Sequence, residues 1–100
     1  MAGATTLRLL IRGRVQGVGF RYAFADEARA RKLRGWVRNR RDGSVEPVFA
    51  GPAATVAQMV AACRRGPPAA RVNAVDEREG SLADLGLRRP SERFSVASTG

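Results

Sequence analysis

A glycine-rich segment near the N-terminus has the composition of an anion-binding turn. Gly13, Gly17 and Gly19 separate an alternating apolar run, TTLRLLIR (5–12), from a run with helical periodicity, FRYAFADEARARKL (20–33). A glycine-rich turn between a strand and a helix lets several backbone N–H groups converge on one concavity, and the helix N-terminus adds a positive dipole. Such a segment could hold a phosphate or a carboxylate without using side chains.

Arg21 follows these glycines at the predicted start of the helix. Its guanidinium could clamp the same anion through paired hydrogen bonds. The glycines match neither common phosphate fingerprint, because no Lys-Ser or Lys-Thr pair follows them and their spacing is not GxGxxG. Local sequence alone therefore leaves two interpretations open: an anion-binding loop with its arginine, or a tight turn followed by a solvated arginine.

The titratable residues restrict the available chemistry. The chain contains no histidine and a single cysteine, Cys63. Histidine triads, histidine general bases and histidine or cysteine metal sites are therefore excluded, and no metal or other cofactor is expected. Cys63 lies on an apolar helical stripe with Val56, Met59 and Val60, so we interpret it as a core thiol rather than a nucleophile.

The basic charge is concentrated in the N-terminal part of the chain. The formal net charge is +9, and residues 1–41 carry eleven basic and two acidic residues, whereas residues 42–100 carry seven of each. A positive field there would attract small anions, and it would also attract nucleic acid. GC-rich coding could explain the preference for arginine over lysine, but it does not explain the uneven distribution.

Length and composition indicate a single globular domain. The chain has 100 residues, of which 44% are hydrophobic and 27% are charged, and we expect one domain over residues 1–100 with a loose tail over residues 1–4. No apolar run approaches the roughly 20 residues that span a membrane, and the N-terminus lacks a signal-peptide pattern. With a lone cysteine, these features predict a cytoplasmic protein with no membrane partner.

Hydrophobic periodicity predicts an α+β fold. The expected strands cover residues 5–12, 35–40, 44–50, 71–79 and 94–98, and the expected helices cover residues 20–33 and the segment between Gly51-Pro52 and Gly66-Pro67-Pro68. Asp42-Gly43 predicts a hairpin, Pro47 favours an edge strand, and Gly35 is expected just after the first helix. This order favours two helices packed on one face of a mostly antiparallel sheet, with a long loop over residues 80–90.

Two separated motifs resemble the acylphosphatase family. They are GRVQGVGFR (13–21) and GWVRNRRDGSVEPVFAG (35–51), and the resemblance extends over roughly residues 7–98. It implies a ferredoxin-like α/β sandwich of order βαββαβ and an enzyme that hydrolyses the carboxyl–phosphate bond of small acyl phosphates. In that family the loop cradles the phosphate, the arginine that ends the loop binds it, and an asparagine in the second motif orients water.

By this match, the catalytic residues are Arg21 and Asn39. The match assigns the phosphate-binding loop to Arg14, Val15, Gln16, Gly17, Val18, Gly19, Phe20 and Arg21. From local sequence alone, Asn39 would be a turn residue, and Gln16 could merely buttress the loop. We interpret Trp36 and Phe20 as core residues, and Arg38, Arg40 and Arg41 as a solvated face.

Lys32 departs from a frequent pattern in related sequences, which often carry glycine near the end of the first helix. If this residue adopts a positive φ, lysine costs on the order of 1 kcal/mol relative to glycine. The departure concerns stability and not the site.

An acyl phosphate suits a site without histidine or metal. Its leaving group is a carboxylate whose conjugate acid has a pKa of about 4, so it departs unprotonated, and phosphoryl transfer then needs mainly positioning and charge neutralisation. The expected partners are the acyl phosphate and inorganic phosphate, with the chain a monomer that binds no specific nucleic acid. Two alternatives remain: a catalytically silent phosphate-binding domain, and a basic nucleic-acid-binding module, which the lack of an RNP-like aromatic motif disfavours.

Overall fold

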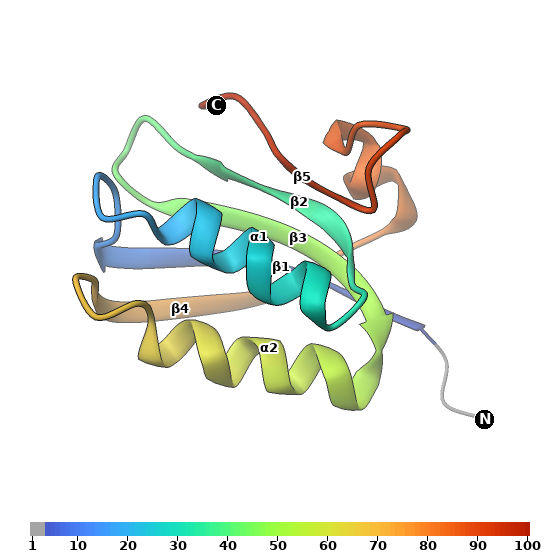
Figure 1. Cartoon of the computed structure of the whole chain (residues 1–100), viewed down its shortest axis with the longest axis horizontal. Helices are drawn as coiled ribbons and strands as arrows, with labels where there is room; N and C mark the ends of the chain where they lie inside the picture. The colour runs from blue at the N-terminus through green and yellow to red at the C-terminus, as the bar shows by residue number, and fades with distance from the viewer. Residues whose placement is uncertain (1–3) are drawn as a thin grey trace.

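The computed structural model describes residues 4–100. The elements follow in the order β1 (Ala4–Arg14), α1 (Phe20–Ala30), β2 (Arg34–Asn39), β3 (Val45–Pro52), α2 (Ala53–Arg65), β4 (Arg71–Glu79), the 3₁₀ helix η1 (Leu82–Leu87) and β5 (Phe94–Val96). The strands form one sheet in the order β4-β1-β3-β2-β5, which is antiparallel except where β5 pairs with β2. Both helices cover one face of this sheet (Figure 1). The predicted ferredoxin-like sandwich is therefore confirmed.

The core lies between the sheet and the two helices. Alternate residues of β1, Leu9 and Ile11, are fully buried there, and Phe24 of α1 packs edge-on against Phe49 of β3 with ring centroids 5.6 Å apart. The buried side of α2 consists of the predicted stripe, namely Val56, Met59, Val60 and Cys63. This packing fixes α1 over β2 and β5, with its first turn at the carboxyl end of β1 (Figure 1).

Phe20 and Trp36 are core residues, as predicted. Phe20 belongs to the core between helices and sheet, whereas Trp36 joins a smaller cluster on the opposite face, which η1 covers through Leu85. The Trp36 indole N–H donates a hydrogen bond of 2.7 Å to the carbonyl oxygen of Asp84. The 3₁₀ helix η1 therefore occupies the region that we expected to be an irregular loop.

The predicted edge position of Pro47 is wrong, because β3 lies between β1 and β2. The register of β1 with β3 pairs Arg8 with Val48 and resumes only where Ile11 pairs with Val45. The ladder is thus interrupted opposite Pro47, and this interruption lets a residue without an N–H group occupy a central strand.

The first helix also ends earlier than predicted. It stops at Ala30, and Gly35 lies within β2 rather than at the helix exit. Gly35 has φ of 148°, and a Cβ atom there would lie 2.0 Å from the carbonyl oxygen of Val48 on β3. A glycine is therefore required by close strand packing and not by helix termination. Of the predicted loose tail, residues 1–3 lie outside the described part of the chain, and Ala4 already pairs with Pro52.

Lys32 adopts the left-handed conformation, with φ of 59°. Lys32→Gly should relieve this strain and raise the free energy of unfolding by about 1 kcal/mol relative to Lys32→Ala, which removes the exposed side chain but keeps a Cβ atom. Urea unfolding of the three proteins measures the difference. Equal stabilities of the glycine and alanine variants would show that the backbone conformation at this position carries no strain.

Candidate active site

The loop between β1 and α1 turns through two glycines in the left-handed region. Gly17 has φ of 73° and Gly19 has φ of 79°, values that L side chains rarely adopt. Apart from the adjoining residues, no atom of the described chain lies within 4 Å of a Cβ built at either glycine. These positions therefore require glycine for its backbone conformation and not for lack of space.

The N-terminus of α1 opens directly from this loop. Gly19 caps the helix without a side-chain hydrogen bond, and the first turn contains no acidic residue. The first N–H groups of a helix have no intrahelical acceptor. Their donors and the positive end of the helix dipole are thus left for an anion.

Residues of both motifs line a single cavity of about 230 Å³. The first motif supplies two of its three glycines together with Arg21, and the second motif supplies Asn39. The full lining is Val15, Gly17, Gly19, Phe20, Arg21, Tyr22 and Asn39. Arg21 and Asn39 are both half-buried. The structure therefore brings the two predicted catalytic side chains together at one concave site, next to the helix N-terminus.

Three residues of the predicted loop lie outside the lining of this cavity. Arg14 is the exposed last residue of β1, opposite Arg71 of β4, and Val18 packs against the core. Gln16 has a different role: its side-chain Nε2 donates hydrogen bonds to the carbonyl oxygens of Arg40, at 2.8 Å, and Ser44, at 2.9 Å. These hydrogen bonds tie the loop to the hairpin that carries Asn39, as expected if Gln16 buttresses the loop.

The hairpin turn itself follows the predicted Asp42-Gly43 pair. The Asp42 carboxylate accepts hydrogen bonds from the Ser44 hydroxyl at 2.6 Å and from the Ser44 backbone N–H at 2.9 Å. These bonds hold the pKa of Asp42 below its usual range. Gly43 has φ of 92°, so the turn uses the conformation that only glycine adopts readily.

A buried carboxylate holds the two residues on either side of Asn39. Glu46 is 1% exposed and its Oε1 accepts from Arg38 Nε at 2.7 Å and from Arg40 Nη1 at 3.2 Å, while its Oε2 accepts from Arg8 Nε at 2.5 Å. The interpretation of Arg38 and Arg40 as a solvated face is therefore wrong. Because side chains alternate along a strand, this cluster lies on one face of β2 and Asn39 points to the other, towards α1.

Because of Glu46, the free energy of unfolding should depend on pH in the acidic range. Burial raises its pKa, but hydrogen bonds from Arg38 and Arg8 outweigh burial and lower the pKa from its ordinary value of 4.5. A lowered folded-state pKa adds stability that is fully present above pH 4.5 and is lost as the pH falls through the folded-state value. Glu46→Gln should lower the free energy of unfolding by about 2 kcal/mol at neutral pH.

The measurement is urea unfolding at neutral pH and in mild acid. The wild type should lose more stability on acidification than Glu46→Gln does, and the two curves should converge. Glu79→Gln is the matched control, because Glu79 is an exposed carboxylate at the end of β4. Parallel curves for wild type and Glu46→Gln would contradict a role for the ionised Glu46.

Among residues 4–100, neither the lone cysteine nor a cluster of metal-ligating side chains indicates a second reactive centre. Cys63 is buried and burial raises the pKa of its thiol, so the core interpretation is confirmed. Within residues 4–100, no group of three or more potential metal-ligating side chains occurs. No helix in the same range is long and apolar enough to cross a membrane.

A family model described as Acylphosphatase matches residues 7–85. The chain belongs to the acylphosphatase family. It is 56% identical over 92 residues to the acylphosphatase of Rhodopseudomonas palustris (strain BisB18), a match that covers 92% of this chain and 93% of the relative. It is 58% identical over 92 residues to the acylphosphatase of Nitrobacter hamburgensis, again covering 92% of this chain and 93% of the relative.

The fold agrees with this family at the level of coordinates. The crystal structure of acylphosphatase from Bacillus subtilis superposes with a TM-score of 0.81 at 40% sequence identity, covering 95% of this chain and 99% of that chain. The resemblance predicted from the two motifs is thus confirmed. The family model, the relatives and the solved structure support an enzyme, an acylphosphatase, over a silent phosphate-binding domain or a nucleic-acid-binding module.

Proposed function

We propose that this chain hydrolyses the carboxyl–phosphate bond of small acyl phosphates in the cavity between the glycine loop and Asn39. The observation that carries the proposal is that one cavity is lined by Gly17, Gly19 and Arg21 from the first motif and by Asn39 from the second. Family membership supplies the reaction class, and the geometry supplies the residues.

The phosphoryl group binds at the N-terminus of α1. Its oxygens accept hydrogen bonds from N–H groups of the loop and of the first helical turn, and the guanidinium of Arg21 neutralises the charge that those oxygens carry. The backbone donors are positioned before substrate enters, because the dihedral angles of Gly17 and Gly19 and the two hydrogen bonds of Gln16 hold the loop. The loop thus stabilises the transition state without rearranging.

The Asn39 amide accepts a hydrogen bond from the attacking water and orients it in line with the leaving oxygen. The water oxygen forms a bond to phosphorus while the bond between phosphorus and the carboxylate oxygen breaks. The carboxylate leaves unprotonated, and both protons of the water remain on the product phosphate. A dianionic acyl phosphate and water thereby give a carboxylate and dihydrogen phosphate, with atoms and charge balanced and without a histidine base.

Hydrolysis of benzoyl phosphate by the purified chain, followed by ultraviolet absorbance, tests this proposal. We expect turnover with competitive inhibition by inorganic phosphate. We also expect full activity in EDTA, because the sequence offers no histidine and only one, buried cysteine. Phosphate binding without turnover would identify a silent domain, and loss of activity in EDTA that Mg²⁺ restores would contradict the metal-free mechanism.

We further propose a cytoplasmic monomer without a specific nucleic-acid partner. The net charge of +9 serves to attract anionic substrate. Any nucleic-acid binding should disappear near physiological ionic strength, since it would depend on counterion release. Size-exclusion chromatography tests the monomeric state. Fluorescence anisotropy of a labelled oligonucleotide over a salt series tests the absence of specific nucleic-acid binding.

A further inference from the structure

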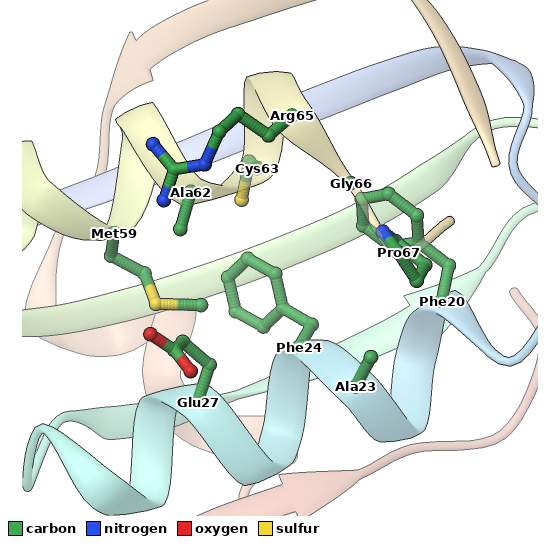
Figure 2. Close-up of a pocket in the computed structure, with 10 residues that line it drawn as sticks. All are labelled: Phe20, Ala23, Phe24, Glu27, Met59, Ala62, Cys63, Arg65, Gly66 and Pro67. Carbon is green, nitrogen blue, oxygen red and sulfur yellow. The ribbon is translucent and has the colours of Figure 1, made fainter. Parts of the chain in front are cut away.

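A second cavity lies between the two helices. It has a volume of about 240 Å³ and runs along the seam where Phe20 and Phe24 of α1 face Met59 and Ala62 of α2 (Figure 2). Pro67, just after the end of α2, closes it beside Phe20. The walls of this cavity, which we call the interhelical groove, are mostly apolar. Glu27 and Arg65 are its charged lining residues, and Glu27 is ion-paired with Arg31 at 2.8 Å.

The interhelical groove and the cavity to which we assign the phosphate have one lining residue in common. Phe20 lines both cavities. It is the first residue of α1, so its backbone N–H belongs to the helix end that we assign to the phosphate, and its buried ring lies next to Gly66 and Pro67. A substrate whose phosphate binds at the helix end would therefore lie next to a residue that also lines the groove.

In-line displacement sets the direction in which the acyl group leaves the phosphorus. The attacking water and the leaving oxygen lie on opposite sides of the phosphoryl group. Asn39, which we assign to the water, is the last residue of β2, and β2 packs against α1 on the side away from α2 (Figure 1). The leaving oxygen, and with it the acyl group, is thus directed towards α2 and the interhelical groove.

We infer that the interhelical groove binds the apolar part of the acyl group, so that the preferred substrates are acyl phosphates with an aromatic ring or an aliphatic chain of several carbons. This inference rests on the proposed function. Each methylene that enters the groove should raise kcat/KM, by up to about fourfold for complete burial. Acetyl phosphate is too short to benefit, and it serves as the baseline.

The test compares acetyl, butyryl, hexanoyl and benzoyl phosphate as substrates of three proteins. Ala62→Phe places a ring in the groove, and Ala61→Phe places the same ring on the exposed adjacent position of α2, which does not line the groove. In the wild type and in Ala61→Phe, kcat/KM should rise at least tenfold from acetyl to hexanoyl phosphate. In Ala62→Phe the rise should shrink to threefold or less.

Binding of alkylphosphonates, measured by calorimetry, gives a readout that needs neither turnover nor a variant. Hexylphosphonate should bind the wild type at least tenfold more tightly than methylphosphonate. Equal affinities, or equal chain-length dependence in Ala62→Phe and Ala61→Phe, would overturn the inference while leaving the proposed function intact. Tighter binding of hexylphosphonate to a protein that hydrolyses no acyl phosphate would support the groove and refute the reaction. If Ala62→Phe fails to fold, the wild-type phosphonate series decides alone.

Discussion

Arg21→Ala is expected to lower kcat/KM for an acyl phosphate by roughly 10³-fold and to abolish most of the competitive inhibition by inorganic phosphate. The guanidinium lines the phosphate cavity at the first turn of α1. Among the residues that the structure describes, no carboxylate forms an ion pair with Arg21. The guanidinium carbon of Arg21 lies 5.6 Å from the centre of the Tyr22 ring. Its charge is therefore available to the substrate in both the ground state and the transition state.

The design of this experiment separates charge from geometry. Arg21→Lys keeps the charge but cannot make two parallel hydrogen bonds, so it should recover only a small part of the lost activity. Arg14→Ala is the matched control, because Arg14 belongs to the same loop motif but is exposed and lies outside the cavity. The assignment of Arg21 fails if the folded alanine variant retains normal inhibition by phosphate, or if Arg14→Ala is equally impaired.

Local periodicity was sufficient to predict most of the elements. The helix α2 buries the four residues that its spacing of three and four indicated, and β4 has the predicted bounds, Arg71–Glu79. The Asp42-Gly43 turn was also predicted, because the side chain of Asp42 and the positive φ of Gly43 are local properties. In each of these cases the physical cause lies within a few residues of the chain.

The errors at Pro47, Arg38 and Arg40 concern contacts that the strands of the sheet make with one another. Proline normally indicates an edge strand, and nothing near Pro47 in sequence shows that the β1–β3 ladder would be interrupted opposite it. Arg38 and Arg40 were assigned to solvent because their partner, Glu46, becomes visible only when the hairpin register places it opposite Arg38. That pairing follows from the predicted turn, because the hairpin register sets Arg38 opposite Glu46.

The site shows the same division between local and distant relations. The glycine loop suggested an anion site from its own residues, but Asn39 was assigned through family resemblance, since alone it was a turn residue beside a hairpin. The cavity that both line depends on how α1 packs over β2, and the hydrogen bonds from Gln16 to the hairpin hold the loop and Asn39 in register. The sequence pattern alone does not specify how closely the glycine loop and Asn39 approach each other in the fold.

Asn39→Ala is expected to reduce kcat by about 10²- to 10³-fold while leaving KM and inhibition by phosphate within a few-fold of the wild type. The backbone at this position is held independently of the side chain, because Asn39 pairs with Val45 of β3 and its carbonyl oxygen accepts a 3.0 Å hydrogen bond from the N–H of Gly100. Replacement by alanine should therefore remove the amide without moving the strand. An interaction with the attacking water exists only on the way to the transition state, so its loss lowers kcat and spares binding.

Two further variants make the assignment specific. Asn39→Asp keeps the size of the side chain but brings a negative charge towards an anionic substrate, so it should be no more active than Asn39→Ala and should also weaken phosphate inhibition. Asn73→Ala removes an exposed asparagine of β4 that does not line the cavity, and it should have wild-type kinetics. If Asn39→Ala turns over like Asn73→Ala, the side chain of Asn39 only shapes the hairpin, and the water must be oriented by another group of the cavity. If phosphate inhibition is lost together with kcat, Asn39 contacts the phosphoryl group itself. The position of Asn39 would then no longer indicate where the attacking water lies, nor that the acyl group leaves towards the interhelical groove.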